Sequence, residues 1–523
     1  MENTYTKSKK EHNPRNWFKD HLFCIREEDG YMTFLACMLF LALTALLFVC
    51  LDGSLIYQAK ARVSMAQTGL TEHLLANYDV PLANRYHLYF LDPRMNGQTL
   101  EEEGQAYYKE LFQGSSGMSL FSSPVWRMET EYLSVVPYGT MYEKECQFFI
   151  AQIEDCMKYD LTKDLLMKVL GNAAQETEKQ ADRLEETVKN LDKTNPADKG
   201  SQDSADDTLT PSDVAEGELA GSEVQKNNPL QKIRSILEYG VLGIVADEAQ
   251  LSDRKIAPSL LPFQNQNEKK IALSMDILKN LSNIDDLITE QGLSNLTVNL
   301  TSQGALNLYI QKYFNSYKKE NVIEDTRLLY EVEYILGGQN SDKENLEYVV
   351  NRLVLLRFAL NAVYGFGNEE LREEALALSA VLTGITGTPE FMEAVRYIIL
   401  AAVNLIESVT DVEALLKGEK IPVVKTAADW KTSISGRIKE SSQSVEQGLD
   451  YQGYVMILLT LQSDVTSKCY RMQNLMQINI QEEEPTFQIK ECKEAVEIKT
   501  GVEVKPMFYL NEYLLEMEEN AAY

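Results

Sequence analysis

A long uncharged apolar segment constrains this chain more than any other feature of its sequence. From Tyr31 to Leu51 the sequence reads YMTFLACMLFLALTALLFVCL, without one charged residue. At about 1.5 Å per residue, a helix of this length spans roughly 31 Å, which matches the hydrocarbon core of a bilayer. A secretory signal peptide has a shorter apolar run of about 7–15 residues. The segment therefore predicts a transmembrane helix over 31–51, with the lipid bilayer as its partner.

The flanking charges predict how this helix is oriented. Basic residues precede it at Lys7, Lys9, Lys10, Arg15, Lys19 and Arg26. Basic flanks stay in the cytoplasm, so residues 1–30 form a cytoplasmic leader and the remainder lies outside. The nearest small-x-small site, Ala59-Lys60-Ala61, lies well past the apolar run in a charged stretch, where signal-peptidase cleavage is poor. We expect a single-pass protein of the cell membrane.

The apolar pattern continues beyond the membrane as a predicted stalk helix over 52–80. Its apolar residues step by three and four at Ile56, Ala59, Val63, Ala66, Leu70 and Leu74. This spacing is typical of a helix with one apolar face, which Pro81 would end. Membrane helix and stalk together would form a rod of about 70 Å.

Rods of this design are how pilins and pseudopilins pack into filaments, and a prepilin peptidase cuts such subunits after a glycine before the apolar run. Gly30 and Tyr31 occupy that place, which makes them a possible processing site. Leu35 stands where pilin-type and TadE-type subunits carry a glutamate, and the leader is long. An uncut signal anchor, whose stalk packs on its own domain, remains the alternative.

The remainder predicts an α+β fold that is predominantly helical, with a small mixed or antiparallel sheet. We divide it into a first exterior part over 81–191, a disordered acidic linker over 192–229, and a second exterior part over 230–523. The linker has no aromatic residue and too little apolar surface to offset chain entropy. Strands are expected near Val125–Val136, at Leu328–Leu336 from its alternating pattern, and in the segment that ends in VEVKPMF. Helices are expected over most of the rest, including one from about Tyr451 to Ile478.

Composition excludes one class of partner. Of the 523 residues, 44% are hydrophobic and 25% charged, which is ordinary for a globular protein of two or three domains. The net charge is −29, and we find no local basic patch. Phosphate backbones are repelled by such a surface, so we expect no nucleic-acid binding.

An ordered series of sequence blocks resembles a known family along nearly the whole chain. The blocks are GYMTFLACMLFLALTALLFVCLDGSLIYQAKARVSMA, YDVPLANRYHLYFLD, LEYGVLGIVADEAQLSDRKI, LLYEVEYILGGQNSDKENLEYVVNRLVLLRFALN, LLKGEKIPVVKTAADW, LDYQGYVMILL and VEVKPMF. They are similar to the family called domain of unknown function 5702. The resemblance implies a single-pass protein of Gram-positive, clostridium-like bacteria, encoded near genes for tight-adherence (Tad/Flp) pilus machinery. It implies no activity, cofactor or catalytic residue.

The residues themselves offer no reaction chemistry. The sequence contains no HExxH, CxxC, GxSxG or GxxxxGK motif. His73 and His87 lie 14 positions apart, but structural histidines are commoner than ligands, so we expect no metal site. Glu101, Glu102 and Glu103 are consecutive and point in different directions, as in a solvated run. We therefore expect neither an enzyme nor a cofactor.

Four cysteines fall in the predicted exterior part, where disulfides are permitted: Cys146, Cys156, Cys469 and Cys492. The local pairings Cys146–Cys156 and Cys469–Cys492 are the first to test. On one straight helix, however, Cys146 and Cys156 would be about 15 Å apart, too far to bridge. Free buried thiols are the alternative.

These features favour a structural or assembly component, pseudopilin-like, of a Tad/Flp-type pilus system, with pilin-like subunits or pilus assembly proteins as partners. An anchored ligand-binding or sensory ectodomain of the cell envelope is the alternative.

Overall fold

The computed structural model of the chain describes residues 14–91, 99–114, 127–158, 233, 236, 240–246, 251–264, 303–383, 388–434, 448–462, 464–505 and 512–523. These residues form two compact units. Unit 1 comprises Met1–Tyr78, Leu91–Tyr138 and Lys493–Tyr523, and unit 2 comprises Asp79–Phe90 and Gly139–Cys492. The expected linker at 192–229 lies outside the described residues.

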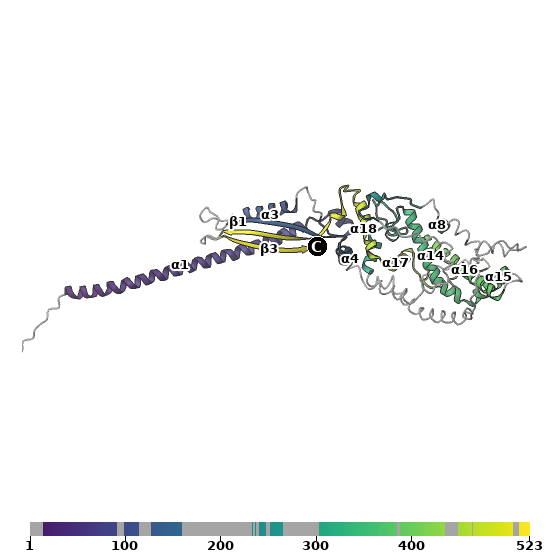
Figure 1. Cartoon of the computed structure of the whole chain (residues 1–523), viewed down its shortest axis with the longest axis horizontal. Coiled ribbons are helices and arrows are strands. Elements are labelled where there is room, and N and C mark those ends of the chain that lie inside the picture. Colours follow the sequence, from purple (N-terminus) through teal and green to yellow (C-terminus); the bar gives the residue numbers. More distant parts are fainter. Residues whose placement is uncertain are drawn as a thin grey trace, which may run out of the picture. The chain divides into compact units, whose positions relative to one another are not determined.

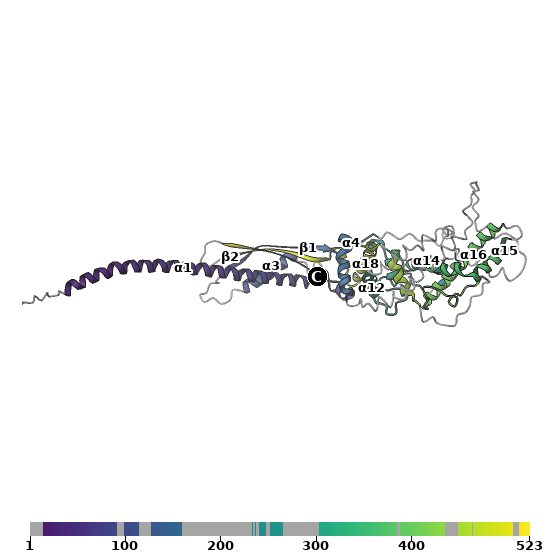
Figure 2. The same cartoon turned by 90° about the horizontal axis from the view of Figure 1, so that it is seen from below.

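Unit 1 combines two helices with a three-stranded antiparallel sheet, which confirms the predicted α+β class. Its elements are α1 (Pro14–Leu75), α3 (Leu100–Gly114), β1 (Arg127–Thr140), β2 (Lys493–Lys505) and β3 (Tyr513–Ala522). The strand order is β1-β2-β3, and β2 pairs with β3 from Ala495↔Ala522 to Val504↔Tyr513. Figures 1 and 2 show the second half of α1 running along this sheet.

The predicted apolar stripe of α1 forms one side of the unit 1 core. Ala59, Val63, Ala66, Leu70 and Leu74 are buried, and Ile56 is half-buried. The five buried residues pack against alternate residues of β2 (Val496, Ile498, Val502 and Val504), Leu133 and Val135 of β1, and Tyr108 of α3. Each fully buried Val or Leu contributes about 1.5–3 kcal/mol. The stripe thus fixes α1 to the sheet. The helix ends at Leu75, before Pro81.

Unit 2 is helical in its described residues. It contains α2 (Val80–Tyr86), α4 (Glu143–Met157), α8 (Leu242–Val245), α12 (Gly304–Tyr313), α13 (Glu331–Gly337), α14 (Asp342–Gly367), α15 (Glu369–Thr383), α16 (Pro389–Lys417), α17 (Tyr451–Leu461) and α18 (Val465–Ile480), with short 3₁₀ turns η4 (Pro258–Leu260) and η7 (Ile489–Glu491). The helix α18 is buried along most of its length. Its polar side chains bind nearby backbone: Asn474 pairs with both N–H and C=O of Phe263, and the guanidinium of Arg471 donates to the carbonyls of Ile335 and Leu336.

Two predictions of secondary structure were wrong. Leu328–Leu336 is not a strand, because α13 occupies Glu331–Gly337. Its period-two pattern did not mark an inside and an outside face, since Glu331 and Glu333 between the apolar residues are also buried. The expected helix from Tyr451 to Ile478 is interrupted between α17 and α18, where Asp464 caps the second helix by accepting from the Ser467 N–H.

The compact units do not follow the consecutive boundaries expected at 81–191 and 230–523. Strands β1 and β2 are neighbours in one sheet, yet almost all of unit 2 lies between them in the sequence. The larger segment of unit 2 is therefore inserted between two neighbouring strands of unit 1.

Candidate functional site

The stretch of α1 from Tyr31 to Leu51 presents apolar side chains on all sides. From Tyr31 to Leu51 its large apolar residues are 41–67% exposed, in contrast to the buried stripe that follows. The described helix Tyr31–Leu75 is long and apolar enough to cross a bilayer, and none of its most apolar window is buried. This is compatible with a single-pass anchor. Gly30 and Tyr31, the possible processing site, both lie within α1.

A second helix, α14, passes the same test of length and composition, but 53% of its apolar window is buried inside the protein. Leu346, Val349, Leu353 and Val354 belong to the core of unit 2. Helix α14 is therefore a core helix of unit 2.

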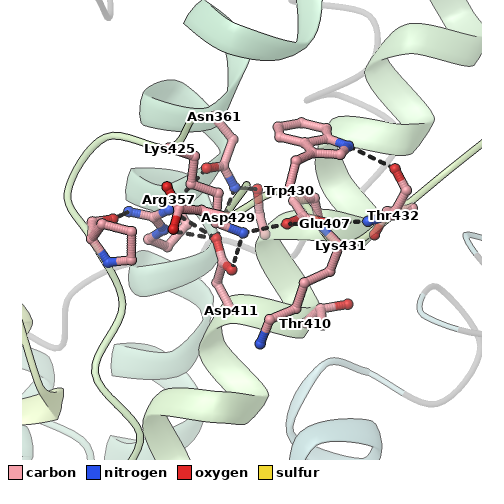
Figure 3. Close-up of polar contacts among 12 residues, drawn as sticks. Arg357, Asn361, Glu407, Thr410, Asp411, Lys425, Asp429, Trp430, Lys431 and Thr432 are labelled. Atoms are coloured by element: carbon pink, nitrogen blue, oxygen red, sulfur yellow. Dashed lines mark hydrogen bonds and ion pairs between the residues drawn. The ribbon is translucent and has the colours of Figure 1, made fainter. Parts of the chain in front are cut away.

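The most elaborate polar arrangement among the described residues is a buried charged network in unit 2, which the sequence analysis missed. Helix α16 carries a polar stripe of Asn404, Glu407, Ser408 and Asp411 at spacings of three and four, all fully buried. The side chains of Arg357 and Asn361, one turn apart on α14, face this stripe (Figure 3).

Arg357 joins three parts of the chain. Its Nε donates to Asp411 Oδ2 at 3.0 Å, and its Nη2 donates to Asn361 Oδ1 at 2.8 Å. Its Nη1 donates to the carbonyls of Pro422 and Val423, both at 3.0 Å, and lies 2.7 Å from the Tyr454 hydroxyl oxygen. The side chain is fully buried, so these contacts replace water completely.

Lys425 completes the network from the segment that follows α16. Its ammonium pairs with Asp411 Oδ1 at 2.5 Å and with Glu407 Oε1. Glu407 also accepts the backbone N–H of Lys431 at 3.0 Å and that of Thr432 at 2.7 Å. The indole of Trp430 lies 5.9 Å from the Lys425 ammonium. Four contacts thus hold residues 425–432 against α16.

The electrostatics of the network indicate a structural lock. Burial alone would raise the pKa of Asp411, but the charges of Arg357 and Lys425 outweigh it and hold this pKa below its ordinary value. Two cations and two carboxylates neutralise one another, and none of the four is turned toward solvent. The arrangement can rigidify unit 2, but it offers no exposed acid, base or nucleophile. Its sequence signal was the polar stripe within an otherwise apolar helix.

A second set of buried hydrogen bonds surrounds two carboxylates of α13. Glu331 accepts the backbone N–H of Asn315 at 2.8 Å and the amide of Asn479 at 2.6 Å. Glu333 accepts the N–H of Tyr317 at 3.0 Å and the Tyr451 hydroxyl at 2.7 Å. Burial raises the pKa of each glutamate to about 7, although these hydrogen bonds oppose the shift. The two carboxylates anchor the connection between α12 and α13.

The structure brings together two of the four predicted disulfide cysteines, in a pairing other than the local ones. Cys146 and Cys469 are hydrogen-bonded to each other and fully buried. Cys156 lies 3.7 Å from the Tyr313 hydroxyl, and Cys492 donates to the Gln488 carbonyl at 3.8 Å. All four are free thiols in the structure.

The two histidines have different partners, and that of His73 belongs to the acidic run. His73 hydrogen-bonds Glu103 at 3.1 Å and stacks on Tyr107, whereas His87 packs edge-on against Tyr313. The run Glu101–Glu103 forms the first turn of α3, where carboxylates favour the positive end of the helix dipole. The described part of the chain contains no group of three or more His, Cys, Asp or Glu side chains placed to hold a metal.

Comparisons with known proteins identify a family but no function. No curated protein and no solved structure matches the chain. The model of a family of unknown function (DUF5702) matches residues 220–504, which run through the described helices α8 to α18 and strand β2. Helix α1 and strands β1 and β3 lie outside the matched residues. Because the match covers more than half of the chain, the protein belongs to the family of unknown function DUF5702.

Proposed function

We propose that this protein is a membrane-anchored extracytoplasmic protein that serves as a structural or assembly component, pseudopilin-like, of a Tad/Flp-type pilus system, without catalytic activity. The supporting observation is the change of environment along α1. Residues 31–51 are apolar and exposed on all sides, whereas the stripe from Ala59 to Leu74 is buried on the sheet of unit 1. One helix can therefore occupy a bilayer or a filament core with its first half while its second half carries a folded unit.

Processing at Gly30 tests whether the protein can enter a filament. The measurement is the N-terminal residue of the full chain extracted from membranes of cells with a complete pilus locus. A pseudopilin begins at Tyr31, and Gly30→Leu retains the leader. The control Gly53→Ala, whose new methyl group meets no atom within 4 Å, is processed like the wild type.

Deletion of the gene tests the pilus role itself. Loss of piliation or adherence, restored by the wild-type chain, is expected. Unchanged piliation and adherence contradict the role, even if the leader is removed.

The proposed orientation is tested by labelling intact cells with a membrane-impermeant maleimide. Glu374 is exposed on α15. A Glu374→Cys variant should be labelled before lysis, whereas Lys9→Cys in the leader should react only after lysis. The reverse pattern contradicts the proposed orientation.

Leu35 favours the second candidate function, an anchored ligand-binding or sensory ectodomain. It occupies the position where pilin-type subunits carry a glutamate, and its side chain is 41% exposed. Retention of Met1 in the mature protein supports this alternative, in which crosslinking in intact cells recovers an envelope partner rather than pilin-like subunits.

A further inference from the structure

The thiols of Cys146 and Cys469 meet between helices that are far apart in the sequence. Cys146 lies in the first turn of α4 and Cys469 in α18, and their side chains are hydrogen-bonded. Gln473, one turn after Cys469, points to the same place: its Nε2 lies 3.6 Å from Cys146 Sγ and 3.3 Å from the Met141 carbonyl oxygen. One face of α18 therefore holds Cys146 at two points.

The backbone at Cys146 is strained. Lys144, Glu145 and Cys146 are consecutive residues with φ of 49°, 58° and 65°. Residues with a side chain avoid this left-handed region, because Cβ crowds the following carbonyl oxygen. Such a turn persists only where its surroundings hold it, and the buried Cys146 side chain is the point at which α18 does so.

We propose that Cys146 and Cys469 form a disulfide bond that joins α4 to α18. The proposal rests on the extracytoplasmic location within the proposed function, because disulfides persist in oxidising compartments. The acceptor is a protein disulfide or a low-molecular-weight disulfide. Cys146 Sγ attacks one acceptor sulfur and releases the other as a thiol. Cys469 Sγ then displaces the remaining acceptor sulfur, so two protein thiols become one disulfide and one acceptor disulfide becomes two thiols.

The environments of the two sulfurs assign this order. The hydrogen bond from Cys469 lowers the pKa of Cys146 against the effect of burial, and Gln473 lowers it further. The same hydrogen bond and burial raise the pKa of Cys469. Both shifts, together with the Gln473 amide that lies 3.6 Å from Cys146 Sγ, favour Cys146 as the attacking thiolate and Cys469 as the second thiol. Because both sulfurs are buried, the exchange takes place while unit 2 folds or when α4 opens locally.

The test maps the thiols of the full chain in two arms. In the first arm, cells are alkylated at harvest, and the membrane-extracted chain is digested without reductant for mass spectrometry. In the second arm, the purified chain is reduced, loosened with urea, and treated with oxidised glutathione before alkylation. A linked peptide pair containing Cys146 and Cys469, two hydrogen atoms lighter than the separate reduced peptides, is expected in both arms.

Serine variants provide the controls. Cys146→Ser and Cys469→Ser abolish the linked pair, whereas Cys156→Ser and Cys492→Ser retain it. Reductant should lower the Tm of the wild type by roughly 5–10 °C, because the bond closes a long loop, and should leave that of the Cys146→Ser/Cys469→Ser variant unchanged. If the bond forms only in the second arm, the result supports the pairing but contradicts the extracytoplasmic location. Alkylation of both thiols in both arms, or a bond to Cys156 or Cys492, overturns the proposal.

Discussion

The ring of Tyr132 on β1 lies directly over Gly501 on β2. A Cβ atom at position 501 would be 2.2 Å from Tyr132 Cε1, so only glycine accommodates the ring in this position. Gly501 is in register with Glu516 of β3, and the Tyr132 hydroxyl donates to Glu516 Oε1 at 3.2 Å. One side chain therefore bridges all three strands on the sheet face opposite α1.

This relationship predicts a coupled effect of two substitutions. Gly501→Ala displaces the Tyr132 ring and should lower the free energy of unfolding of the wild type by about 1 kcal/mol. In a Tyr132→Ala background the same change should be neutral or stabilising, since alanine restricts the unfolded chain more than glycine does. Denaturant unfolding of the four proteins gives the coupling energy. Equal effects of Gly501→Ala in both backgrounds contradict the packing, and Tyr132→Phe isolates the hydrogen bond to Glu516.

The part of the fold that the sequence predicted is the part with one-sided burial. The α1 stripe alternates with exposed residues such as Tyr57 and Met65, so its helical period is visible in the amino-acid order. In strand β2, Val496, Ile498, Val502 and Val504 pack in the core, whereas Glu497, Lys499 and Glu503 are half-buried or exposed. In such elements the order of apolar and polar residues in the sequence indicates which side chains face the core.

The pattern failed where both sides of an element are buried. In α13 the carboxylates of Glu331 and Glu333 lie inside the protein because they bind backbone N–H groups, so alternation did not separate inside from outside. Local pattern likewise could not place β1 beside β2, since residues 141–492 intervene between the strands. The helical spacing of the polar residues around Arg357 and around Asp411 is visible in the sequence. Which of them pair, however, depends on the packing of α14 on α16.

The charged network predicts a large loss of stability when one partner is removed. Arg357→Met leaves Asp411 without one of its two cations and removes a donor from the carbonyls of Pro422 and Val423, of which that of Pro422 keeps the Tyr454 hydroxyl. We expect the free energy of unfolding of unit 2 to fall by about 3–5 kcal/mol, as for other broken buried ion pairs. Chemical denaturation followed by circular dichroism measures the change.

An exposed ion pair of similar chemistry is the matched control. Lys417 pairs with Glu413 at the surface end of α16, so Lys417→Met should cost less than about 1 kcal/mol. The double variant Arg357→Met/Asp411→Leu removes one cation and one anion, and should lose less than the sum of its single changes. If Arg357→Met lowers the free energy of unfolding by less than about 1 kcal/mol, the network does not stabilise unit 2 as proposed.

The two carboxylates of α13 predict a pH dependence of stability. In the unfolded chain a glutamate releases its proton near pH 4.3, but the pKa of Glu331 and of Glu333 in the folded protein is about 7. Between these values the folded state binds more protons than the unfolded state. Their stabilising contribution is therefore complete below about pH 4.3 and is lost as the pH rises through 7, at about 1.4 kcal/mol per pH unit for each group.

Urea unfolding between pH 5 and pH 8 measures this dependence. The midpoint should fall with rising pH over the lower part of the range, and Glu333→Gln should remove about half of the slope while keeping an acceptor for Tyr317 and Tyr451. Glu374→Gln on the exposed face of α15 should leave the slope unchanged. A slope that is the same in Glu333→Gln and the wild type excludes Glu333 as its source.

Two helical glycines in unit 1 predict opposite responses to the same substitution. In both, alanine should favour the helix by about 0.5–1 kcal/mol through backbone entropy. At Gly53 of α1 the new methyl group meets no atom within 4 Å, so Gly53→Ala should realise this gain. At Gly104 of α3 it would lie 2.7 Å from Leu133 Cδ2 and 3.5 Å from Leu70 Cδ2, inside the packed core. Overpacking of such cores costs about 1–3 kcal/mol, so Gly104→Ala should be a net loss. Thermal unfolding of the two variants in detergent compares them directly, and a Tm at or above the wild-type value for Gly104→Ala contradicts the close packing of α3 between α1 and β1.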